Sequence, residues 1–364
     1  MCLETCFGSV PDPRAGNATH RLGDLIVMMV AASLCGAATA TEFALFAETR
    51  RAVLSRLIDY DVAPSHDTFS RLLRLLDPRA FEQAFASFAA GFARALGESS
   101  GTTVATPDEV VALDGKALRR AYEQGQQAYP PLTVSAFATQ TRLCLAAASP
   151  TAAENEIEAA LKVIALIDLT DKIVTADALH CHRRMAEAVV EQNADYVLAL
   201  KGNRGHWHKE AESLLARAPS PPVVEQTERG HGRDEWRKAE VVPVETALMP
   251  GHAAIIRITS RRDRSEPLTR LFMTSRVFSP QQALDITRAH WQVENGLHWM
   301  LDVHLAEDMN RARKDHAPAN IAILKRIAKN ILQMTDPPKV PISHRIKKCA
   351  WNDDYLLKAL AHMR

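Results

Sequence analysis

The stretch EVVALDG, residues 109–115, has the pattern of a short strand that ends at a carboxylate, Asp114. A second stretch, KIVTADA at residues 172–178, has the same character and ends at Asp177. Short apolar, β-branched runs of this kind favour strands. Sites in an open α/β sheet assemble at strand ends, so both aspartates are candidate site residues.

Strands and helices alternate around these two stretches. Further strands are expected at 132–139, 142–149 and 194–202, and helices at 154–167 and 181–192. The order of these elements along the chain predicts one mixed α/β sheet: three strands come first, and then a helix, a strand, a helix and a strand. Residues 222–277 then alternate in a basic pattern, which predicts a β-rich antiparallel insert of three or four strands at about 219–277.

The first hundred residues predict helices and turns. A buried helix is expected at about 21–37; its apolar run LIVMMVAASLCGAATA is short for a bilayer span, so no membrane partner is expected. Others follow at about 41–60 and after Pro78, and the breakers in residues 1–20 predict a loose arm. A polar linker at 98–108 divides a helical region, 1–100, from an α/β core, 108–335, and a basic helical tail, 336–364.

The stretch VAPSHDTFSRLLRLLD, residues 62–77, predicts a turn and a capped helix. Ser65 or Asp67 can cap this helix, and its apolar residues recur at helical spacing. Arg71 and Arg74 then face outward, as in a helix-turn-helix element that contacts DNA. The alternative is an ordinary packed helix pair.

A long helix is expected to begin near Pro280. Its apolar face is predicted to contain Ile286, Ala289, Val293, Leu297, Met300 and Val303. Four polar residues recur at four-residue steps on the neighbouring face: His290, Glu294, His298 and Asp302. Glu294 is therefore a third candidate carboxylate.

Carboxylates at such positions cost free energy unless a charge compensates them. Their oxygens suit hard cations such as Mg²⁺ or Mn²⁺. Three acids around two such ions about 4 Å apart have the geometry of phosphoryl transfer on nucleic acid. An aspartate after a strand is alternatively a helix cap or turn former. The three candidate acids follow the layout of RNase H-like nucleases and recombinases. One lies on the first predicted strand, one on the fourth, and one on the helix that follows the fifth.

Charge is unevenly distributed along the 364 residues, although the net charge is only +1. Residues 277–310 carry five acids and one base, whereas residues 311–364 carry four acids and twelve bases. An acidic centre beside basic segments suits a carboxylate site that also holds a polyanion; the alternative is a solvated basic helix. The six cysteines show no C-x-x-C pair, which is typical of reduced thiols in the cytoplasm.

Seven stretches together resemble the DDE transposases of bacterial insertion sequences, in the group that includes the H-repeat-associated proteins. They span about residues 20–335: PSHDTFSRLLRLLDP, VALDGKALRR, VSAFAT, IVTADALHC, ADYVLALKGN, HGRDEWR and HWQVENGLHWMLDVHLAED. The resemblance implies an RNase H-like core with a β-rich insert and a helical N-terminal region that binds the element's ends. It also implies a catalytic triad of Asp114, Asp177 and Glu294 that holds two Mg²⁺ or Mn²⁺ ions.

One motif departs from the family. Many relatives surround the glutamate with Tyr-x2-Arg-x3-Glu-x6-Lys, whose side chains grip terminal phosphates, and those places hold Thr287, His290 and Leu301 here. Arg288 and His290 are expected to substitute as DNA contacts, together with His298. Both histidines are alternatively metal ligands or hydrogen-bond partners of metal ligands.

Other basic residues follow the predicted strands. Lys116, Arg119, Arg120 and Lys201 are expected to contact DNA phosphates. For the first three, the alternative is a solvated basic turn.

These patterns lead us to expect a bacterial enzyme of the cytoplasm, associated with the nucleoid. It would cleave double-stranded DNA at the element's ends and transfer the freed 3′-OH to target DNA. Two ends must join one target, so at least a homodimer on DNA is expected. The alternatives are an element-derived DNA-binding protein that no longer catalyses and a structure-specific nuclease without strand transfer.

Overall fold

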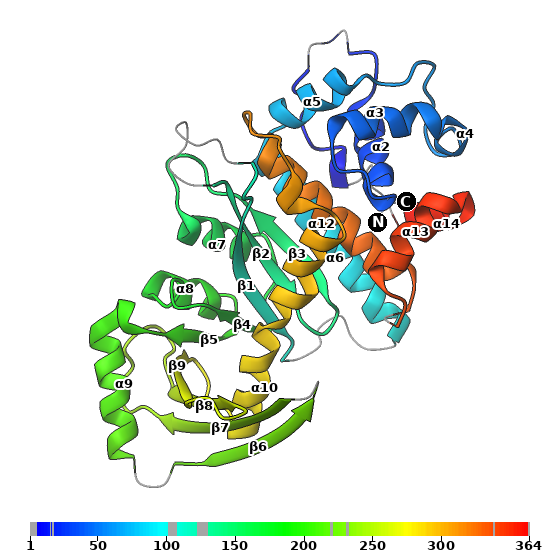
Figure 1. Ribbon diagram of the computed structural model, residues 1–364. Coiled ribbons are helices and arrows are strands. Elements are labelled where there is room, and N and C mark those ends of the chain that lie inside the picture. Colours follow the sequence, from blue (N-terminus) through cyan, green and yellow to red (C-terminus); the bar gives the residue numbers. More distant parts are fainter. Residues whose placement is uncertain are drawn as a thin grey trace.

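The computed structural model describes residues 6–14, 16, 18–100, 108–121, 130–218, 221–230, 233–337 and 339–362. Most of the predicted linker, at 101–107, and the first residues of the insert, 219–220, lie outside this range. A nine-stranded sheet in the order β3-β2-β1-β4-β5-β9-β8-β7-β6 crosses the molecule (Figure 1).

The first five strands form one half of this sheet. They are β1 (Val110–Ala117), β2 (Leu132–Ala138), β3 (Leu143–Ala148), β4 (Ile173–Ala176) and β5 (Asp195–Leu200). β1, β2 and β3 pair antiparallel, whereas β1, β4 and β5 run parallel. The parallel strands are connected through α7 (Glu156–Ala165) and α8 (Arg183–Val190). The mixed α/β prediction is confirmed, with the RNase H-like layout of strands and crossover helices.

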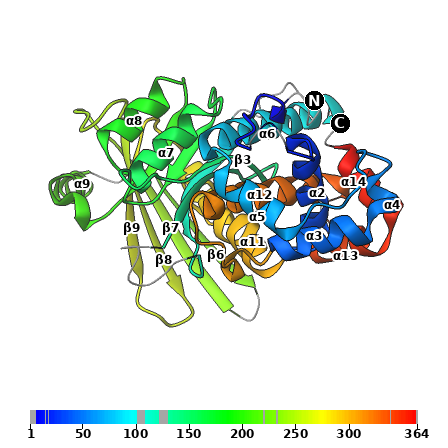
Figure 2. The same ribbon diagram turned by 90° about the horizontal axis from the view of Figure 1, so that it is seen from above.

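The insert continues the sheet instead of forming a separate one. Its elements are α9 (Gly205–Arg217), β6 (Val223–Gly230), β7 (Arg233–Pro243), β8 (Ala254–Arg262) and β9 (Leu268–Thr274). β6 to β9 form an antiparallel meander, and β9 pairs antiparallel with β5. Seen from above, these strands lie on the opposite side of the molecule from the N-terminal helices (Figure 2).

The N-terminal helices begin where the sequence offers caps. They are α2 (Leu22–Leu34), α3 (Ala40–Thr49), α4 (Arg51–Leu54), α5 (His66–Leu75) and α6 (Pro78–Ser100). Thr39 and Glu42 form a capping box on α3, and Ser65 caps α5. The single helix expected at 41–60 is wrong: α3 ends at Thr49 and α4 follows, at a turn where Arg50 reaches Asp353 of the C-terminal helices.

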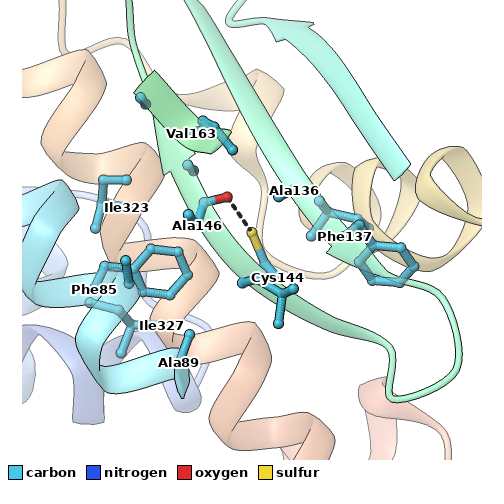
Figure 3. Close-up of a cluster of buried hydrophobic side chains, with 14 of the residues drawn as sticks. Phe85, Ala89, Ala136, Phe137, Cys144, Ala146, Val163, Ile323 and Ile327 are labelled. Carbon is cyan, nitrogen blue, oxygen red and sulfur yellow. Dashed lines mark hydrogen bonds between the residues drawn. The ribbon is translucent and has the colours of Figure 1, made fainter. Parts of the chain in front are cut away.

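One core joins the N-terminal helices to the sheet. α12 (Ala317–Thr335) packs on α2, α5 and α6 and also on β2 and β3 (Figure 1). Around the free thiol of Cys144, side chains from α6, α7 and α12 meet those of β2 and β3 (Figure 3). β3 is the edge of the sheet and is buried at every position because these helices cover it, which protects the edge from pairing with other chains.

The loose arm expected at residues 1–20 is wrong in part. Phe7 is 2% exposed, and its ring lies 5.6 Å from Phe81 and 5.8 Å from Phe88, centroid to centroid. Cys6 and Val10 are also buried. Cys6 and Phe7 are helical, and the apolar side chains of this segment pack into the core although proline and glycine follow them.

Charge alone left a solvated basic helix as an alternative for the C-terminal segment, and this holds only in part. Lys339, Lys347, Lys348 and Lys358 are exposed, whereas four other bases are buried. Lys325, Arg326 and Lys329 of α12 are all at most 2% exposed, as is Arg345 of α13 (Ile342–Trp351). Their charged heads bind carbonyls and one carboxylate. The last helix is α14 (Asp353–Ala361). Within the described part of the chain, no helix is long and apolar enough to span a membrane.

Candidate active site

Strand register places Asp114 and Asp177 level with each other. β1 and β4 are neighbouring parallel strands in which Val110 pairs with Ile173 and Ala112 with Thr175. The same offset carries Asp114 opposite Asp177, the residue directly after β4. Because side chains alternate faces along a strand, both aspartates point to the face on which Thr175 meets His290 at 2.9 Å. The sheet therefore presents two carboxylates side by side.

Glu294 lies on the helix that packs against this face. The predicted long helix is interrupted: α10 (Pro280–His290) is followed by the π-helical turn η2 (Glu294–His298) and by α11 (Trp299–Val303). A π turn adds one residue and rotates the following face by about 100°. For this reason Val303, which was predicted to be buried, is 55% exposed, whereas Leu301 is fully buried.

Gly296 allows the π turn to lie close to the sheet. A Cβ atom at this position would lie 2.9 Å from Cζ of Phe137, a fully buried ring of β2. Such an approach is shorter than real Cβ atoms show, and the ring has little room to move.

We therefore expect Gly296→Ala to destabilise the protein by about 1–3 kcal/mol, as overpacked cores do. Urea unfolding would measure this. Gly202→Ala, where a Cβ would meet nothing, is the control for the loss of glycine. Equal midpoints for the two variants would contradict the packing argument.

His298 lies between two of the acids. Its Nδ1 atom is 3.4 Å from Oδ2 of Asp114 and 3.7 Å from Oε2 of Glu294. The imidazole is buried, and burial together with Arg326 and Lys116 lowers the pKa of His298 to about 3, so the ring is neutral. Asp114, Glu294 and His298 form a group of potential metal ligands whose ligand atoms lie within 4.8 Å of one another.

The acids repel one another. Burial, followed by the charges of Glu294, Asp177 and Glu156, raises the pKa of Asp114 to about 7. Among the described residues, no Lys or Arg pairs with Asp114, Asp177 or Glu294. The nearby basic side chains form ion pairs with other acids. Lys116 binds Asp302 and Asp308 at 2.7 and 3.0 Å, and Arg288 binds Glu228. Oxygen donors that lack a protein cation fit a divalent cation.

Glu156 is a fourth acid that the sequence analysis missed. It begins α7, and a Cβ atom at position 115 would lie 2.2 Å from its Oε1, so Gly115 leaves room for this carboxylate beside Asp114. The Nε2 atom of buried His180 lies 3.6 Å from the same oxygen. The glycine directly after Asp114 was the available signal, but only the fold reveals which side chain fills the space.

A buried ionic network supports the helix beneath the acids. Lys116 of β1 links Asp302 of α11 to Asp308 of η3 (Glu307–Met309). Next to it, Arg326 binds Glu307 at 2.7 Å, and both side chains are fully buried. Arg326 also donates from Nε to Oγ of Ser135 on β2. The network thus ties the helix that carries Glu294 to the strand that carries Asp114.

The predicted DNA contacts lie in varied surroundings. Arg71 is exposed on α5, whereas Arg74 pairs with Asp315 at 2.7 Å. Arg119 and Arg120 are exposed after β1. Lys201 is exposed after β5, in a loop that Asn203 bonds to the loop after Asp177. Their contacts with DNA stay predictions.

The positions of the missing motif residues face inward. Thr287 is buried and bonds to backbone carbonyls of α10, and Leu301 lies in the core. His290 shares a hydrogen bond with Thr175, and Lys116 and His298 are buried as described above. Arg288, in its pair with Glu228, is the most accessible of these side chains. The predicted DNA contacts of Lys116, Arg288, His290 and His298 remain untested.

A groove of about 980 Å³ runs beside the acids, between the insert and α10. We call it the arginine groove; its cationic and aromatic lining comprises Arg237, Arg261, Arg262, Arg264, Arg270, Arg288, Trp236 and Trp291. Arg270 lies over the ring of Trp291 at 5.7 Å, and Arg261 over that of Trp236 at 5.8 Å. The lining also includes Asn295, the residue after Glu294.

The mixed sheet and its crossover helices define a class, the RNase H-like proteins. The family model described as "Transposase DDE domain" matches residues 105–331, and that described as "DDE_Tnp_1-associated" matches residues 4–89. The chain therefore belongs to the DDE transposase family, in the group that includes the H repeat-associated proteins.

Individual proteins are similar over most of their length. The chain is 29% identical to putative transposase YncI of Escherichia coli O157:H7, over 97% of this chain and 92% of that protein. It is 28% identical to H repeat-associated putative transposase YhhI of E. coli K12, over 97% and 96%. A piggyBac transposase synaptic complex with hairpin DNA aligns with 98% of this chain and 77% of that chain, with a TM-score of 0.42 and 12% identity.

Proposed function

We propose that this protein cleaves DNA at the ends of its own mobile element and joins those ends to target DNA. This is supported most strongly by the position of Asp114 on β1 and of Asp177 directly after the neighbouring parallel strand β4, close enough to Glu294 for both acids to raise the pKa of Asp114. Three acids without a protein cation, in a member of the DDE family, fit two divalent cations, Mg²⁺ or Mn²⁺.

In this proposal Asp114, Asp177 and Glu294 are the catalytic carboxylates. Bound divalent cations supply Lewis-acid polarisation of the scissile phosphate and lower the pKa of an attacking water or 3′-OH. The carboxylates orient the reacting groups, and the ion pairs of buried Lys116 with half-buried Asp302 and Asp308 hold strand and helix at a constant separation. Preorganisation of this kind reduces the cost of reaching the reactive geometry.

The proposal is tested with duplexes that carry the DNA flanking the protein's own gene. We expect specific binding in Ca²⁺ and, in Mg²⁺ or Mn²⁺, strand nicking at one position followed by joining to a target plasmid. Tight specific binding without nicking in either cation would support a non-catalytic DNA-binding protein. Nicking without joining would support a nuclease.

We propose that DNA leaving the acids follows the arginine groove. Among the described residues, Arg261, Arg264 and Arg270 form no ion pair, so their charges are available to phosphates. Trp291 lines the groove, is 54% exposed and offers a face for stacking of an unpaired base.

Arg270→Gln should weaken DNA binding. It should also make the slope of log K against log salt concentration shallower by about 1 for each phosphate that the variant no longer neutralises. The measurement is fluorescence anisotropy with labelled duplex over a range of salt concentrations. Lys358→Gln, on α14 away from the insert, is the control (Figure 1). Unchanged salt dependence for Arg270→Gln would exclude this path.

We further propose that α5 reads the element's ends through Arg71. Arg71→Ala should reduce the preference for specific over random duplex by roughly tenfold to a hundredfold, the effect of removing one side chain that hydrogen-bonds to a base. Arg74→Ala should have a smaller effect because Asp315 already holds that guanidinium. Competition gel shifts with random duplex measure both, and an unchanged preference for Arg71→Ala would show that α5 does not read sequence.

A further inference from the structure

Two histidines lie near the acids, and the structure distinguishes them. Nδ1 of His290 shares a hydrogen bond of 2.9 Å with the hydroxyl of Thr175, so this nitrogen is already engaged. Nδ1 of His298 faces Asp114 and Glu294 instead of a hydroxyl group. Of these two side chains, His298 is the one that directs a ring nitrogen into the space between two carboxylates.

The separations at His298 suit a shared cation better than direct hydrogen bonds. Nδ1 is 3.4 Å from Asp114 and 3.7 Å from Glu294, whereas an N–H···O bond spans about 2.7–3.2 Å. Two ligand atoms that bind one cation at about 2.1 Å stand roughly 3.0–3.6 Å apart, according to the angle between the bonds. The nitrogen therefore lies at about the ligand spacing from each of the two oxygens, and the three ligand atoms lie within 4.8 Å of one another.

No contact in the described structure forces the ring proton of His298 onto Nδ1. The other nitrogen, Nε2, is buried and has no hydrogen-bond partner among the described residues. A donor bonded to Nε2 would place the ring proton on Nδ1 and block it as a ligand. The side chain of His298 is 8% exposed, so it is held at the acids and has little access to solvent.

We propose that His298 is a metal ligand, which joins Asp114 and Glu294 in a mixed nitrogen–oxygen site for one divalent cation. This assignment rests on the proposed function, because it adds a ligand to the cations of the DDE site. A nitrogen donor is poorly matched to Mg²⁺, which prefers oxygen, and is acceptable to transition metals. We therefore expect the chain to bind Mn²⁺ more tightly than Mg²⁺.

The test is pulsed electron paramagnetic resonance on the full chain, without DNA, loaded with one equivalent of Mn²⁺. Electron spin echo modulation from a directly bound imidazole ¹⁴N should appear in the wild type. It should be lost in His298→Gln and retained in His290→Gln, the matched control. Calorimetry should show Mn²⁺ affinity at least about tenfold weaker in His298→Gln, and His298→Asp should narrow the preference for Mn²⁺ over Mg²⁺.

Several outcomes would overturn the assignment. They are a wild-type spectrum without ¹⁴N coupling, coupling that persists in His298→Gln, or no Mn²⁺ binding at millimolar concentration. The wild-type spectrum is decisive even where a variant fails to fold, which circular dichroism would reveal. If the triad carboxylates are required for nicking but no nitrogen coupling is seen, only the histidine assignment fails. If Mn²⁺ binds through His298 but DNA is never nicked, the proposed function fails instead.

Discussion

Asp114→Asn should abolish DNA cleavage and leave DNA binding intact. The substitution keeps the shape of the side chain and removes the charge on which a divalent cation depends. Nicking should fall by several orders of magnitude, since a site of this kind has no second route to its nucleophile. Binding should be equal or slightly tighter, because one repulsion between carboxylate and phosphate is removed. Gel shift and plasmid nicking in Mg²⁺ and in Ca²⁺ measure the two effects.

Asp114→Asn should also change the stability of the metal-free protein, because it removes a buried negative charge without changing the shape of the side chain. Burial and Glu294 raise the pKa of Asp114 to about 7. Without a cation, ionisation of Asp114 therefore destabilises the native state progressively as pH rises from about 4 to about 7, and the full loss remains at higher pH. Asp114→Asn should therefore raise the metal-free thermal midpoint at pH 8. Asp168→Asn, an exposed aspartate before the start of β4, is the control. Equal nicking by wild type and Asp114→Asn would show that the triad is not catalytic.

Arg326→Met should cause the largest loss of stability that a single substitution produces beneath the site. Arg326 and Glu307 are both fully buried and 2.7 Å apart. Removal of the guanidinium leaves a carboxylate without a partner in the core, which typically costs about 3–5 kcal/mol. Ser135 also loses the hydrogen bond that links α12 to β2. Urea unfolding, followed by tryptophan fluorescence, would measure the destabilisation.

A double variant tests the cause of that destabilisation. Arg326→Met combined with Glu307→Leu removes both charges, and it should recover much of the free energy of unfolding, as replaced buried pairs do. Arg184→Ala is the control. It breaks an exposed ion pair between Arg184 of α8 and Glu158 of α7, and it should leave the urea midpoint unchanged. A double variant as unstable as the single one would point to poorer packing instead of an unpaired charge.

The sequence by itself determined the elements and their chemistry. Apolar runs before an aspartate identified β1 and β4, although β1 continues past Asp114 to Ala117 instead of ending there. The order of strands and helices identified the mixed sheet. Ser65 marked the start of α5, because a side-chain cap is an interaction between near neighbours in the chain. Local rules of this kind apply wherever the interacting residues are close in sequence.

Only the tertiary structure decided how those residues meet. The π turn at Glu294 changed the face of the helix after it, so periodicity placed Val303 on the wrong side. Charge alone left a solvated basic helix open as an alternative, yet Lys325, Arg326 and Lys329 of α12 are buried because carbonyls and Glu307 from other elements receive their charges. The place of Glu156 beside Asp114, and of His298 between Asp114 and Glu294, likewise depends on residues far apart in the chain. A sequence pattern records which side chains are available, whereas burial, charge compensation and ligand spacing are properties of contacts that form only when the chain folds.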